Sequence, residues 1–406
     1  MEYERKTQPP RPERRLGKTG RARWQTRKTA LDHPLHEASP MKIAVLNTGS
    51  ATVKSAVVDA TKGGETSLLR RETFERDHQE SLEETLRRAL TTIEAEEADG
   101  LAHRVVHGGV DFVQAVEIDE AVEQSLETLS VMAPLHNPPA LEGIRVARRI
   151  LPGLPAAAVF DTAFHADRSP SSRLYALPWD LMEELGLYRY GFHGLAHASL
   201  VESLARSKGC DPRSVDAVTL QLGSGCSACA VENGRSVETS MGFSPLEGLV
   251  MATRSGDCDP AIALTLLRQG RSIDEVESLL NRESGLLGLG GSADVRDLLH
   301  AEEAGDRRAA VALNLFVRRI VLTVGAYFTL LGGRGSLVFG GGIGTHSAEI
   351  RKRVAAGLRA WDVLLDPERN QQTSPGPVGK AGFRDVYVFE TEEESIIARE
   401  AAAVLG

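Results

Sequence analysis

Residues 41–59 read Met41-Lys-Ile-Ala-Val-Leu-Asn47-Thr-Gly-Ser-Ala-Thr52-Val-Lys54-Ser-Ala-Val-Val-Asp59, and this stretch decides the fold. The apolar run that ends at Asn47 predicts a strand, the small and hydroxyl-bearing residues 48–52 predict a tight turn, and residues 53–59 predict a returning strand. The folded part of the chain is therefore expected to open with a strand, a polar turn and a second strand.

The same plan occurs again about 175 residues further along the chain. Residues 217–222 predict a strand, Gly223-Ser224-Gly225 a turn, and residues 226–231 a second strand that ends at the hairpin signal Asn233-Gly234. One plan that recurs at this spacing indicates a duplicated domain.

Helical patterns alternate with short apolar runs elsewhere. Strands are expected at residues 156–160, ending at Asp161, and at residues 336–339, ending in Gly340-Gly341-Gly342. Helices are expected at residues 77–97, 119–133, 139–151, 194–209, 260–269, 273–282 and 307–331. This alternation predicts α/β layers with mixed sheets, in which a ligand binds at the carboxyl ends of the strands.

Length and charge limit the classes of protein. A chain of 406 residues exceeds what one core usually holds, so two domains are expected. Residues 1–40 carry ten Lys and Arg against five Asp and Glu, and the rest of the chain sums to −14, which argues against a nucleic-acid surface on the acidic body. Residues 1–40 have no apolar run, so a secretory signal or membrane anchor is not expected. They predict a dispensable, disordered basic tail; a targeting arm or a nucleic-acid patch is the alternative.

The four cysteines indicate a reducing compartment such as the cytoplasm, without a disulfide framework. Cys226 and Cys229 form a C-x-x-C pair inside a predicted strand. Because strand positions three apart face opposite sides, zinc or redox chemistry is not expected there.

Arg254 is the one cation in a segment of small and apolar residues, 241–260. Burying an arginine in such surroundings is unfavourable unless an anion meets its planar fork of donors. Two interpretations are open: Arg254 binds an anionic substrate, or it forms a structural ion pair with Asp257 or Asp259.

The two predicted turns suit phosphate groups, since Gly, Ser and Thr turns expose backbone N–H groups and hydroxyls. Lys54 follows the first turn closely. No G-x-x-x-x-G-K-[ST] sequence occurs, so a P-loop is excluded. The segment Gly288-Leu-Gly290 lacks a preceding strand and is expected to be a loop rather than a dinucleotide site.

Further polar groups gather in segments that look turn-like: His103-Arg104-Val-Val-His107, Leu135-His136-Asn, Phe160-Asp161-Thr, and Phe192-His193-Gly. Two arginines, several histidines and a strand-end Asp match the needs of phosphoryl transfer, which neutralises charge on three phosphoryl oxygens while the substrates are held in line. Zinc-type spacing is absent, so any metal is expected to be Mg²⁺ held by phosphates and one or two carboxylates.

At these residues the sequence resembles the acetate kinase family, which includes propionate kinases, of the actin-like, sugar-kinase-like ATPases. The resemblance spans about residues 41–400 and rests on the opening N-x-G-S-x-[ST]-x-K, then HRVVHGG, APLHNPP, FDTAFH, RYGFHG, ETSMGFSPLEGLVMATRSGD and EEESIIARE. It implies duplicated actin-like (ribonuclease H-like) α/β domains around a hinged cleft. The expected bounds are a tail at 1–40, a first domain at 41–163 plus 395–406, and a second, nucleotide-side domain at 164–394.

The resemblance also implies roles for single residues. The implied catalytic residues are Asp161, His193, Arg254 and Arg104. Those implied to bind the acyl substrate are Arg104, Val106, Leu135, His136, Phe192 and Pro245, of which Val106, Leu135, Phe192 and Pro245 form a small apolar pocket. Asn47 and Glu393 are implied to place Mg²⁺.

On the nucleotide side the implied residues are Lys54, Gln221, Gly223, Ser224, Gly225, Asp294, Arg296, Gly342, Ile343, Gly344, Thr345 and His346. This side departs from the family pattern. The family usually has His-Leu-Gly-Asn-Gly where this chain has Gln221-Leu-Gly-Ser224-Gly, and Gly-Ile-Gly-Glu-Asn where it has Gly342-Ile-Gly-Thr345-His346.

The expected function is that of a cytoplasmic acetate kinase, which transfers phosphoryl reversibly from ATP to acetate with Mg²⁺. Preference for propionate, a donor such as pyrophosphate or another nucleotide, and a binding protein without turnover remain open alternatives. The resemblance also implies a homodimer. The apolar stretch 307–331 fits either a dimer face or a core helix, and burial is expected.

Overall fold

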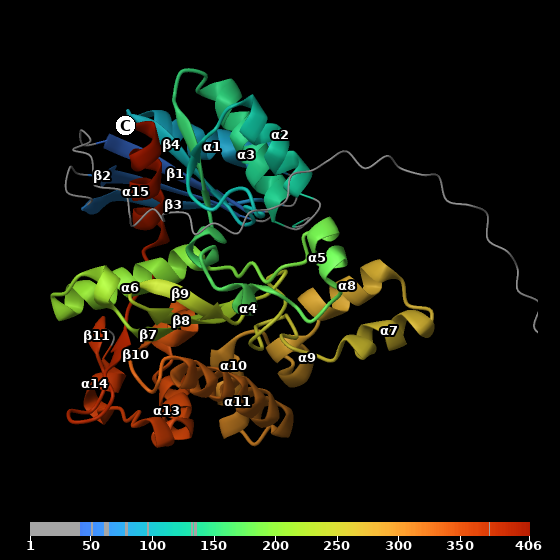
Figure 1. Ribbon diagram of the computed structural model, residues 1–406, viewed down its shortest axis with the longest axis vertical. Helices are drawn as coiled ribbons and strands as arrows, with labels where there is room; N and C mark the ends of the chain where they lie inside the picture. Colours follow the sequence, from blue (N-terminus) through green and yellow to red (C-terminus); the bar gives the residue numbers. More distant parts are fainter. Residues whose placement is uncertain are drawn as a thin grey trace, which may run out of the picture. The chain divides into compact units, whose positions relative to one another are not determined.

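The computed structural model describes residues 41–406 except 50–51, 61–64, 78–79, 96, 131–132, 134–135 and 373. The predicted tail at 1–40, Leu135 and part of the first turn thus lie outside the described residues. The described chain forms two mixed sheets covered by helices (Figure 1). This bears out the α/β class.

The first sheet has the strand order β3-β2-β1-β4-β6-β5. β1 pairs with β2 as an antiparallel hairpin, while β1, β4 and β6 run parallel to one another. Its strands are β1 (Met41–Thr48), β2 (Thr52–Ala60), β3 (Thr66–Glu75), β4 (Gly100–Val105), β5 (Val116–Glu117) and β6 (Ala156–Phe160).

The second sheet repeats this arrangement in the order β11-β12-β10-β7-β8-β9. β7 forms an antiparallel meander with β8 and β9, and it is parallel to β10, which is parallel to β12. Its strands are β7 (Ala217–Leu222), β8 (Cys226–Glu232), β9 (Arg235–Thr239), β10 (Ser336–Gly340), β11 (Gly376–Pro377) and β12 (Val386–Val388). The shared order confirms the duplication expected from the two strand-turn-strand runs.

Helices cover both faces of the first sheet, as the alternation of apolar residues requires. Ala44 and Leu46 point to α1 (Leu82–Ala95) and α3 (Asn137–Ile150), whereas Ile43 and Val45 point to α15 (Glu393–Leu405). The helix α2 (Glu120–Leu129) packs beside α3 through the cluster that contains Leu126. The end of the chain therefore returns to the first sheet.

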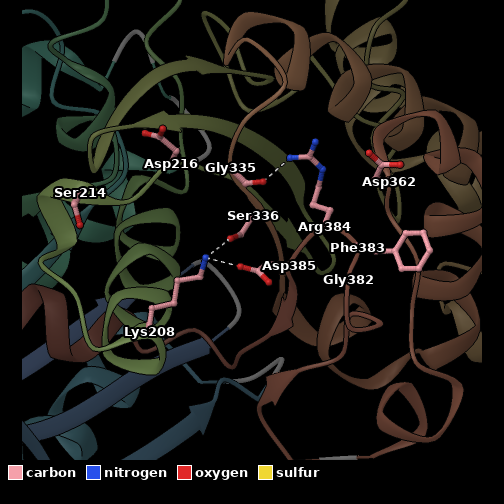
Figure 2. A pocket seen from close by; sticks show the side chains of 10 residues that line it. All are labelled: Lys208, Ser214, Asp216, Gly335, Ser336, Asp362, Gly382, Phe383, Arg384 and Asp385. Atoms are coloured by element: carbon pink, nitrogen blue, oxygen red, sulfur yellow. Dashed lines mark hydrogen bonds and ion pairs between the residues drawn. The ribbon is translucent and has the colours of Figure 1, made fainter.

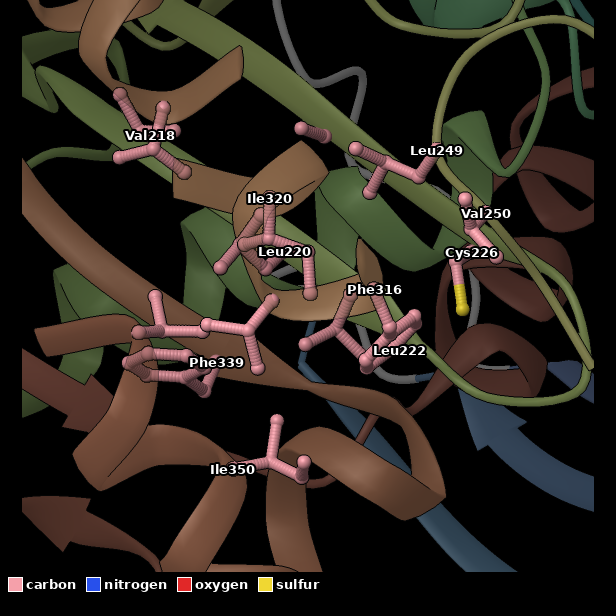
Figure 3. Packing of buried hydrophobic residues seen from close by; sticks show 14 of the residues in the cluster. Val218, Leu220, Leu222, Cys226, Leu249, Val250, Phe316, Ile320, Phe339 and Ile350 are labelled. Atoms are coloured by element: carbon pink, nitrogen blue, oxygen red, sulfur yellow. The ribbon is translucent and has the colours of Figure 1, made fainter. Parts of the chain in front are cut away.

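The second sheet is enclosed in the same way. One face packs on α6 (Gly194–Lys208), and the other packs on α11 (Arg307–Leu330) and α13 (Ala348–Gly357). Figure 3 shows this larger core, to which Phe316 and Ile320 of α11 and Leu220 and Phe339 of the sheet belong. The remaining helices are α4 (Pro170–Arg173), α5 (Trp179–Leu185), α7 (Pro260–Arg268), α8 (Ile273–Arg282), α9 (Gly285–Gly290), α10 (Val295–Glu303), α12 (Gly341–His346) and α14 (Pro367–Gln371).

The apolar stretch at 307–331 forms α11, which buries Phe316, Ile320 and Phe328 in the second core. Within the described residues α11 is the one helix that is long and apolar enough to cross a membrane. One face of α11 is buried, as expected, whereas Val311, Leu322 and Leu330 are exposed.

Two expectations were wrong. The segment at Gly288-Leu-Gly290 is part of the short helix α9 rather than a loop. A Cβ atom at Gly290 would lie 2.6 Å from a Leu298 methyl carbon, so the glycine there permits close helix packing. His103 and Arg104 do not lie in a turn, because they belong to the buried strand β4.

Candidate active site

Polar residues meet at the carboxyl ends of three adjacent parallel strands of the first sheet. Asn47 follows Leu46 in β1, and Leu46 lies opposite His103 in β4. Arg104 comes next in β4, and Asp161 follows directly after β6, whose last residue pairs with Val105. This is the edge at which α/β sheets bind ligands.

Arg104 and Asp161 form a two-armed ion pair. Nε donates to Oδ1 at 2.9 Å and Nη2 donates to Oδ2 at 2.7 Å. Nη1 of Arg104 lies 3.5 Å from Glu393 Oε2 at the start of α15. Burial alone would lower the pKa of Arg104, but the carboxylates of Asp161 and Glu393 outweigh it and raise this pKa. The carboxylate of Asp161 is 2% exposed, so the pair is effectively a buried one.

His193 is held against Asp161 by the backbone of the next residue. Gly194 N donates to Asp161 O at 3.0 Å, and a Cβ atom at Gly194 would lie only 2.1 Å from that oxygen. His193 itself has φ of +57°, a left-handed conformation that costs a non-glycine residue about 1 kcal/mol. Close backbone approach thus fixes His193 at the start of α6, beside the end of β6.

The imidazole of His193 is kept neutral. Burial lowers its pKa to about 4; Glu393 acts in the opposite direction, and the charges of Arg104 and Arg254 lower it further. Burial also lowers the pKa of His136 to about 4, with contributions from the same two arginines. His136 lies at the start of α3. The two histidines and two arginines therefore act on one another across one site.

Arg254 has no carboxylate partner among the described residues. Its Nη1 donates to Pro245 O at 3.2 Å and lies 3.8 Å from Met251 Sδ, and burial lowers its pKa. Asp257 accepts instead from Gly248 N, and Asp259 accepts from Ala261 N at the start of α7. The structure thus contradicts the ion-pair interpretation of Arg254.

Gly225 lies close to the side chains of both Arg254 and His193. A Cβ atom at this glycine would lie 3.2 Å from His193 Nε2 and 3.5 Å from Arg254 Nη1. A guanidinium without an anion and an imidazole nitrogen therefore border the same turn after β7. A phosphoryl group fits such a pair of donors.

Apolar residues lie next to these donors. Val106 is partly buried against the cluster that contains Phe192, and the ring of His107 meets the Phe192 ring edge-on at 5.5 Å. Pro245 belongs to the segment that binds Arg254. Leu135, the fourth residue of the expected pocket, lies outside the described residues.

The nucleotide-side turn is closed by a hydrogen bond from Gly223 N to Gly225 O at 3.0 Å. Ser224 is exposed and its carbonyl accepts from Ala252 N, whereas Gln221 Oε1 is buried without a hydrogen-bond partner. The turn therefore presents one free hydroxyl and leaves one amide oxygen unsatisfied.

The helix α12 lies against this turn. It contains the implied residues Gly342, Ile343, Gly344, Thr345 and His346. Gly341, with φ of +73°, approaches so closely that its Cβ would lie 2.5 Å from Leu222 O. The Thr345 hydroxyl donates to Phe389 O, and Arg351 donates to the carbonyls of Gly344 and Thr345.

Three implied nucleotide residues lie apart from these contacts. Lys54 is exposed on β2. Asp294 accepts from Arg296 N at the start of α10 and forms an ion pair with the Arg296 side chain, which is 84% exposed. No hydrogen bond or ion pair between described residues joins any of the three to the turn or to α12.

The oxygen donors of this site suit Mg²⁺, which needs only a few protein ligands, better than a metal ion that is coordinated by protein side chains alone. No group of three or more His, Cys, Asp and Glu residues gathers anywhere in the described part of the chain. Asp161 and Glu393 do converge on Arg104, and Arg104 follows His103, the strand partner of Leu46, which precedes Asn47. Mg²⁺ is usually bound by one or two carboxylates together with substrate phosphates, so these residues fit it.

Sequence reasoning missed Ser227, whose hydroxyl lies 2.9 Å from His193 Nδ1, and it assigned no role to His197. The available signal was one polar position, Ser227, on the face of β8 that meets α6, but a lone serine in an apolar strand is too common to single out.

An open pocket of about 640 Å³ lies at the other end of the second sheet. It is bordered by Asp216, Ser336 and Asp385, which come at the beginnings of β7, β10 and β12 (Figure 2). Its cations are already bound: Lys208 contacts Ser336 and Asp385, and Arg384 donates to three carbonyls. It is therefore not a candidate for the catalytic site.

Known proteins match both the sequence and this architecture. The acetate kinase of Methanosarcina thermophila is 39% identical over 398 residues, covering 90% of this chain and 97% of that protein. A propionate kinase from Francisella tularensis has a TM-score of 0.82 at 32% identity, and the Porphyromonas gingivalis acetate kinase has 0.79 at 32%; each match covers 90% of this chain and all of the solved chain. A model of the acetokinase family matches residues 68–399. With this match and these relatives, the chain belongs to the acetokinase family.

Proposed function

We propose that this protein is an acetate kinase, which transfers the γ-phosphoryl group of ATP reversibly to acetate and gives acetyl phosphate and ADP. It is a phosphotransferase with a carboxyl group as acceptor, as its family membership indicates. The observation that carries the proposal is Arg254, a partly buried guanidinium with no carboxylate partner among the described residues, beside the neutral imidazole of His193.

The chemistry needs no strong base, because the acceptor carboxylate is already ionised at neutral pH. One of its oxygens forms a bond to the γ-phosphorus, the bond from that phosphorus to the bridging oxygen breaks, and ADP leaves with the electron pair. Arg254 and His193 donate to the phosphoryl oxygens as charge shifts during the transfer. Arg104 holds Asp161 and retains Nη1 as a donor that Asp161 does not engage.

Asn47, Asp161 and Glu393 are the residues that would hold Mg²⁺. When bound, the ion neutralises charge on the phosphates. The protein's own contribution is to keep these oxygens at adjacent strand ends and to limit their motion through the Arg104 ion pair.

Val106, Leu135, Phe192 and Pro245 are proposed to surround the acyl methyl group, with His136 as a supporting donor. A pocket built from such residues favours short acids, and acetate is the proposed substrate, although one methylene changes binding by only about 1–3 kcal/mol. Propionate is the nearest competitor, since propionate kinases are among the relatives in the family.

We propose that residues 41–163 plus 395–406 and residues 164–394 act as two domains that close over the substrates. Each sheet has its own large apolar cluster, and α15 packs on the first sheet, which supports a division into two domains. Closure would exclude water and limit hydrolysis of ATP.

A homodimer in the cytoplasm is proposed as well. Exposed apolar side chains on α7 and α11, among them Ile262, Leu264 and Leu322, offer surface for a second copy. The free cysteines Cys210, Cys226, Cys229 and Cys258 are in keeping with a reducing compartment.

A different phosphoryl donor is the second candidate, because Ser224 and His346 are exposed where the family usually has amides, and the Thr345 hydroxyl is already bound to Phe389 O. Acetyl phosphate trapped as its hydroxamate, with ATP, GTP and pyrophosphate compared in parallel, tests both candidates. Turnover with ATP supports the proposal; turnover with pyrophosphate alone would replace the donor.

A further inference from the structure

A chain of buried polar groups runs from His193 into the interior. His193 Nδ1 lies 2.9 Å from Ser227 Oγ, which lies 2.8 Å from His197 Nε2, and His197 Nδ1 lies 2.8 Å from Thr219 Oγ1. Ser227, His197 and Thr219 each have no exposed surface. They come from β8, α6 and β7, so the chain is built into the packing of the sheet against α6.

The number of protons limits this chain to two arrangements. Burial lowers the pKa of both histidines, so each imidazole is neutral and has one N–H group and one lone pair. The single proton of the Ser227 hydroxyl can be donated to only one of its two nitrogen neighbours, and the hydroxyl must accept from the other. The tautomers of His193 and His197 are therefore coupled.

In the first arrangement Ser227 donates to His193 Nδ1 and accepts from His197 Nε2, and the Thr219 hydroxyl donates to His197 Nδ1. His193 then carries its proton on Nε2. In the second arrangement each of these hydrogen bonds runs in the opposite direction. His193 then carries its proton on Nδ1, and its Nε2 has only a lone pair.

Only the first arrangement suits an anion at the site. Nε2 of His193 faces Gly225 beside Arg254, where the phosphoryl group is expected. An N–H group there attracts phosphoryl oxygens, and a lone pair repels them. The two arrangements thus present different groups, an N–H or a lone pair, to the transferring phosphoryl group.

We propose that Ser227, His197 and Thr219 form a relay of positioning residues that fixes His193 as an Nε2–H donor to the transferring phosphoryl group. The proposal rests on the proposed phosphoryl transfer and adds residues to which no role has been assigned. None of the three touches the substrate, and each acts through His193.

Variants at both ends of the relay test it. Thr219→Val keeps the shape of a buried strand residue and removes the hydroxyl that contacts His197, and Ser227→Ala removes the hydroxyl that contacts His193. We expect kcat to fall roughly tenfold to a hundredfold in Ser227→Ala, as is typical when a hydrogen-bond partner of a functional histidine is lost, and several-fold in Thr219→Val. KM for acetate should change by less than about threefold, because the effect falls on the transition state.

The chain offers a matched control. Ser236 Oγ lies 2.8 Å from His165 Nδ1, a second buried histidine–hydroxyl contact. The His165 ring packs edge-on against His197, and its Nε2 bonds Phe192 O, but no hydrogen bond between described residues joins it to Ser227, His197 or Thr219. Ser236→Ala should lower the thermal midpoint about as much as Ser227→Ala and leave kcat within twofold. His197→Gln, which can still donate to Ser227, should retain more activity than His197→Leu.

Nitrogen NMR of histidine-labelled protein with inorganic phosphate reads the tautomer without turnover, so it separates failure of the relay from failure of the proposed reaction. We expect the Nε2–H form of His193 in the wild type and a mixture in Ser227→Ala and Thr219→Val. An Nδ1–H form in the wild type, an unchanged tautomer in both variants, or kcat within twofold in both variants would overturn the relay. Should Ser227→Ala fail to fold, Thr219→Val alone decides.

Discussion

Arg104 and Asp161, 57 positions apart in the chain, join through two hydrogen bonds of 2.9 and 2.7 Å, so that the guanidinium fork is filled by a buried carboxylate. Arg254 lies in the same site with no carboxylate partner among the described residues. An ion pair with a carboxylate therefore stabilises the charge of Arg104 but not that of Arg254, although both arginines are expected to bind anions. Substitutions at the two positions should separate stability from activity.

Arg254→Ala is expected to lower kcat on the order of 10³, as loss of a catalytic arginine does in phosphoryl transfer. Its thermal midpoint should stay the same or rise, because the substitution removes a partly buried charge that no carboxylate of the described residues balances. Initial rates and thermal unfolding measure both quantities. Arg282→Ala, at an exposed arginine on α8, is the control and should change neither. A kcat within a few-fold of the wild type would remove Arg254 from the mechanism.

Arg104→Ala is expected to lower stability as well as activity. Removing one partner of a buried ion pair leaves the other charge uncompensated, which costs about 3–5 kcal/mol. The Arg104→Ala/Asp161→Ala double variant should regain part of that loss, and denaturant unfolding measures it. Equal stabilities of the wild type and Arg104→Ala would show that the pair contributes nothing.

Local patterns predicted much of the fold. The strand-turn-strand runs at Met41 and Ala217, the strand at 156–160 and the helix at 273–282 follow directly from periodicity and turn residues. The strand β4 was missed because His103 and Arg104 interrupt its apolar pattern, and the charge of Arg104 is balanced only by Asp161 in a distant segment. Such pairing is not visible in a local window.

The site was predictable in its residue types rather than in its contacts. Strand ends and polar turns placed Asp161 and Gly225 at one edge of the sheets, in agreement with the rule for α/β sheets. Side-chain packing decides that Arg104 pairs with Asp161, whereas Arg254 meets no carboxylate in the part of the chain that the structure describes. The relay behind His193 depends on the facing of β7, β8 and α6, which the sequence alone does not define.

Stability should fall with acid below about pH 6.5. Burial lowers the pKa of His103 and His165 to about 3 and of His107, His136 and His193 to about 4. Between these values and 6.5 the unfolded chain binds protons that the folded chain does not, so the free energy of unfolding decreases as pH falls through this window.

Thermal midpoints from pH 8 to 5 check this expectation. His103 Nε2 is buried without a hydrogen-bond partner, so His103→Leu should show a smaller loss of midpoint between pH 7 and 5. A midpoint that does not change from pH 7 to 5 in the wild type would contradict the account.

Val106→Ala should shift preference toward longer acids. Enlarging the acyl pocket by about two methyl groups is expected to raise the propionate-to-acetate ratio of kcat/KM roughly tenfold. Val110→Ala, at a valine of the same segment that is 49% exposed, should leave the ratio unchanged. If both variants keep the wild-type ratio, Val106 does not line the pocket.

The most direct measurement follows the acceptor oxygen. Purified protein is given MgATP and acetate labelled with ¹⁸O in both oxygens, and the product is examined by phosphorus NMR. The account predicts acetyl phosphate whose bridging oxygen, between the carbonyl carbon and phosphorus, is ¹⁸O. This label is seen as an isotope shift of the phosphorus signal. Acetyl phosphate without that shift, or no acetyl phosphate at all, would contradict direct attack of the carboxylate on the γ-phosphorus.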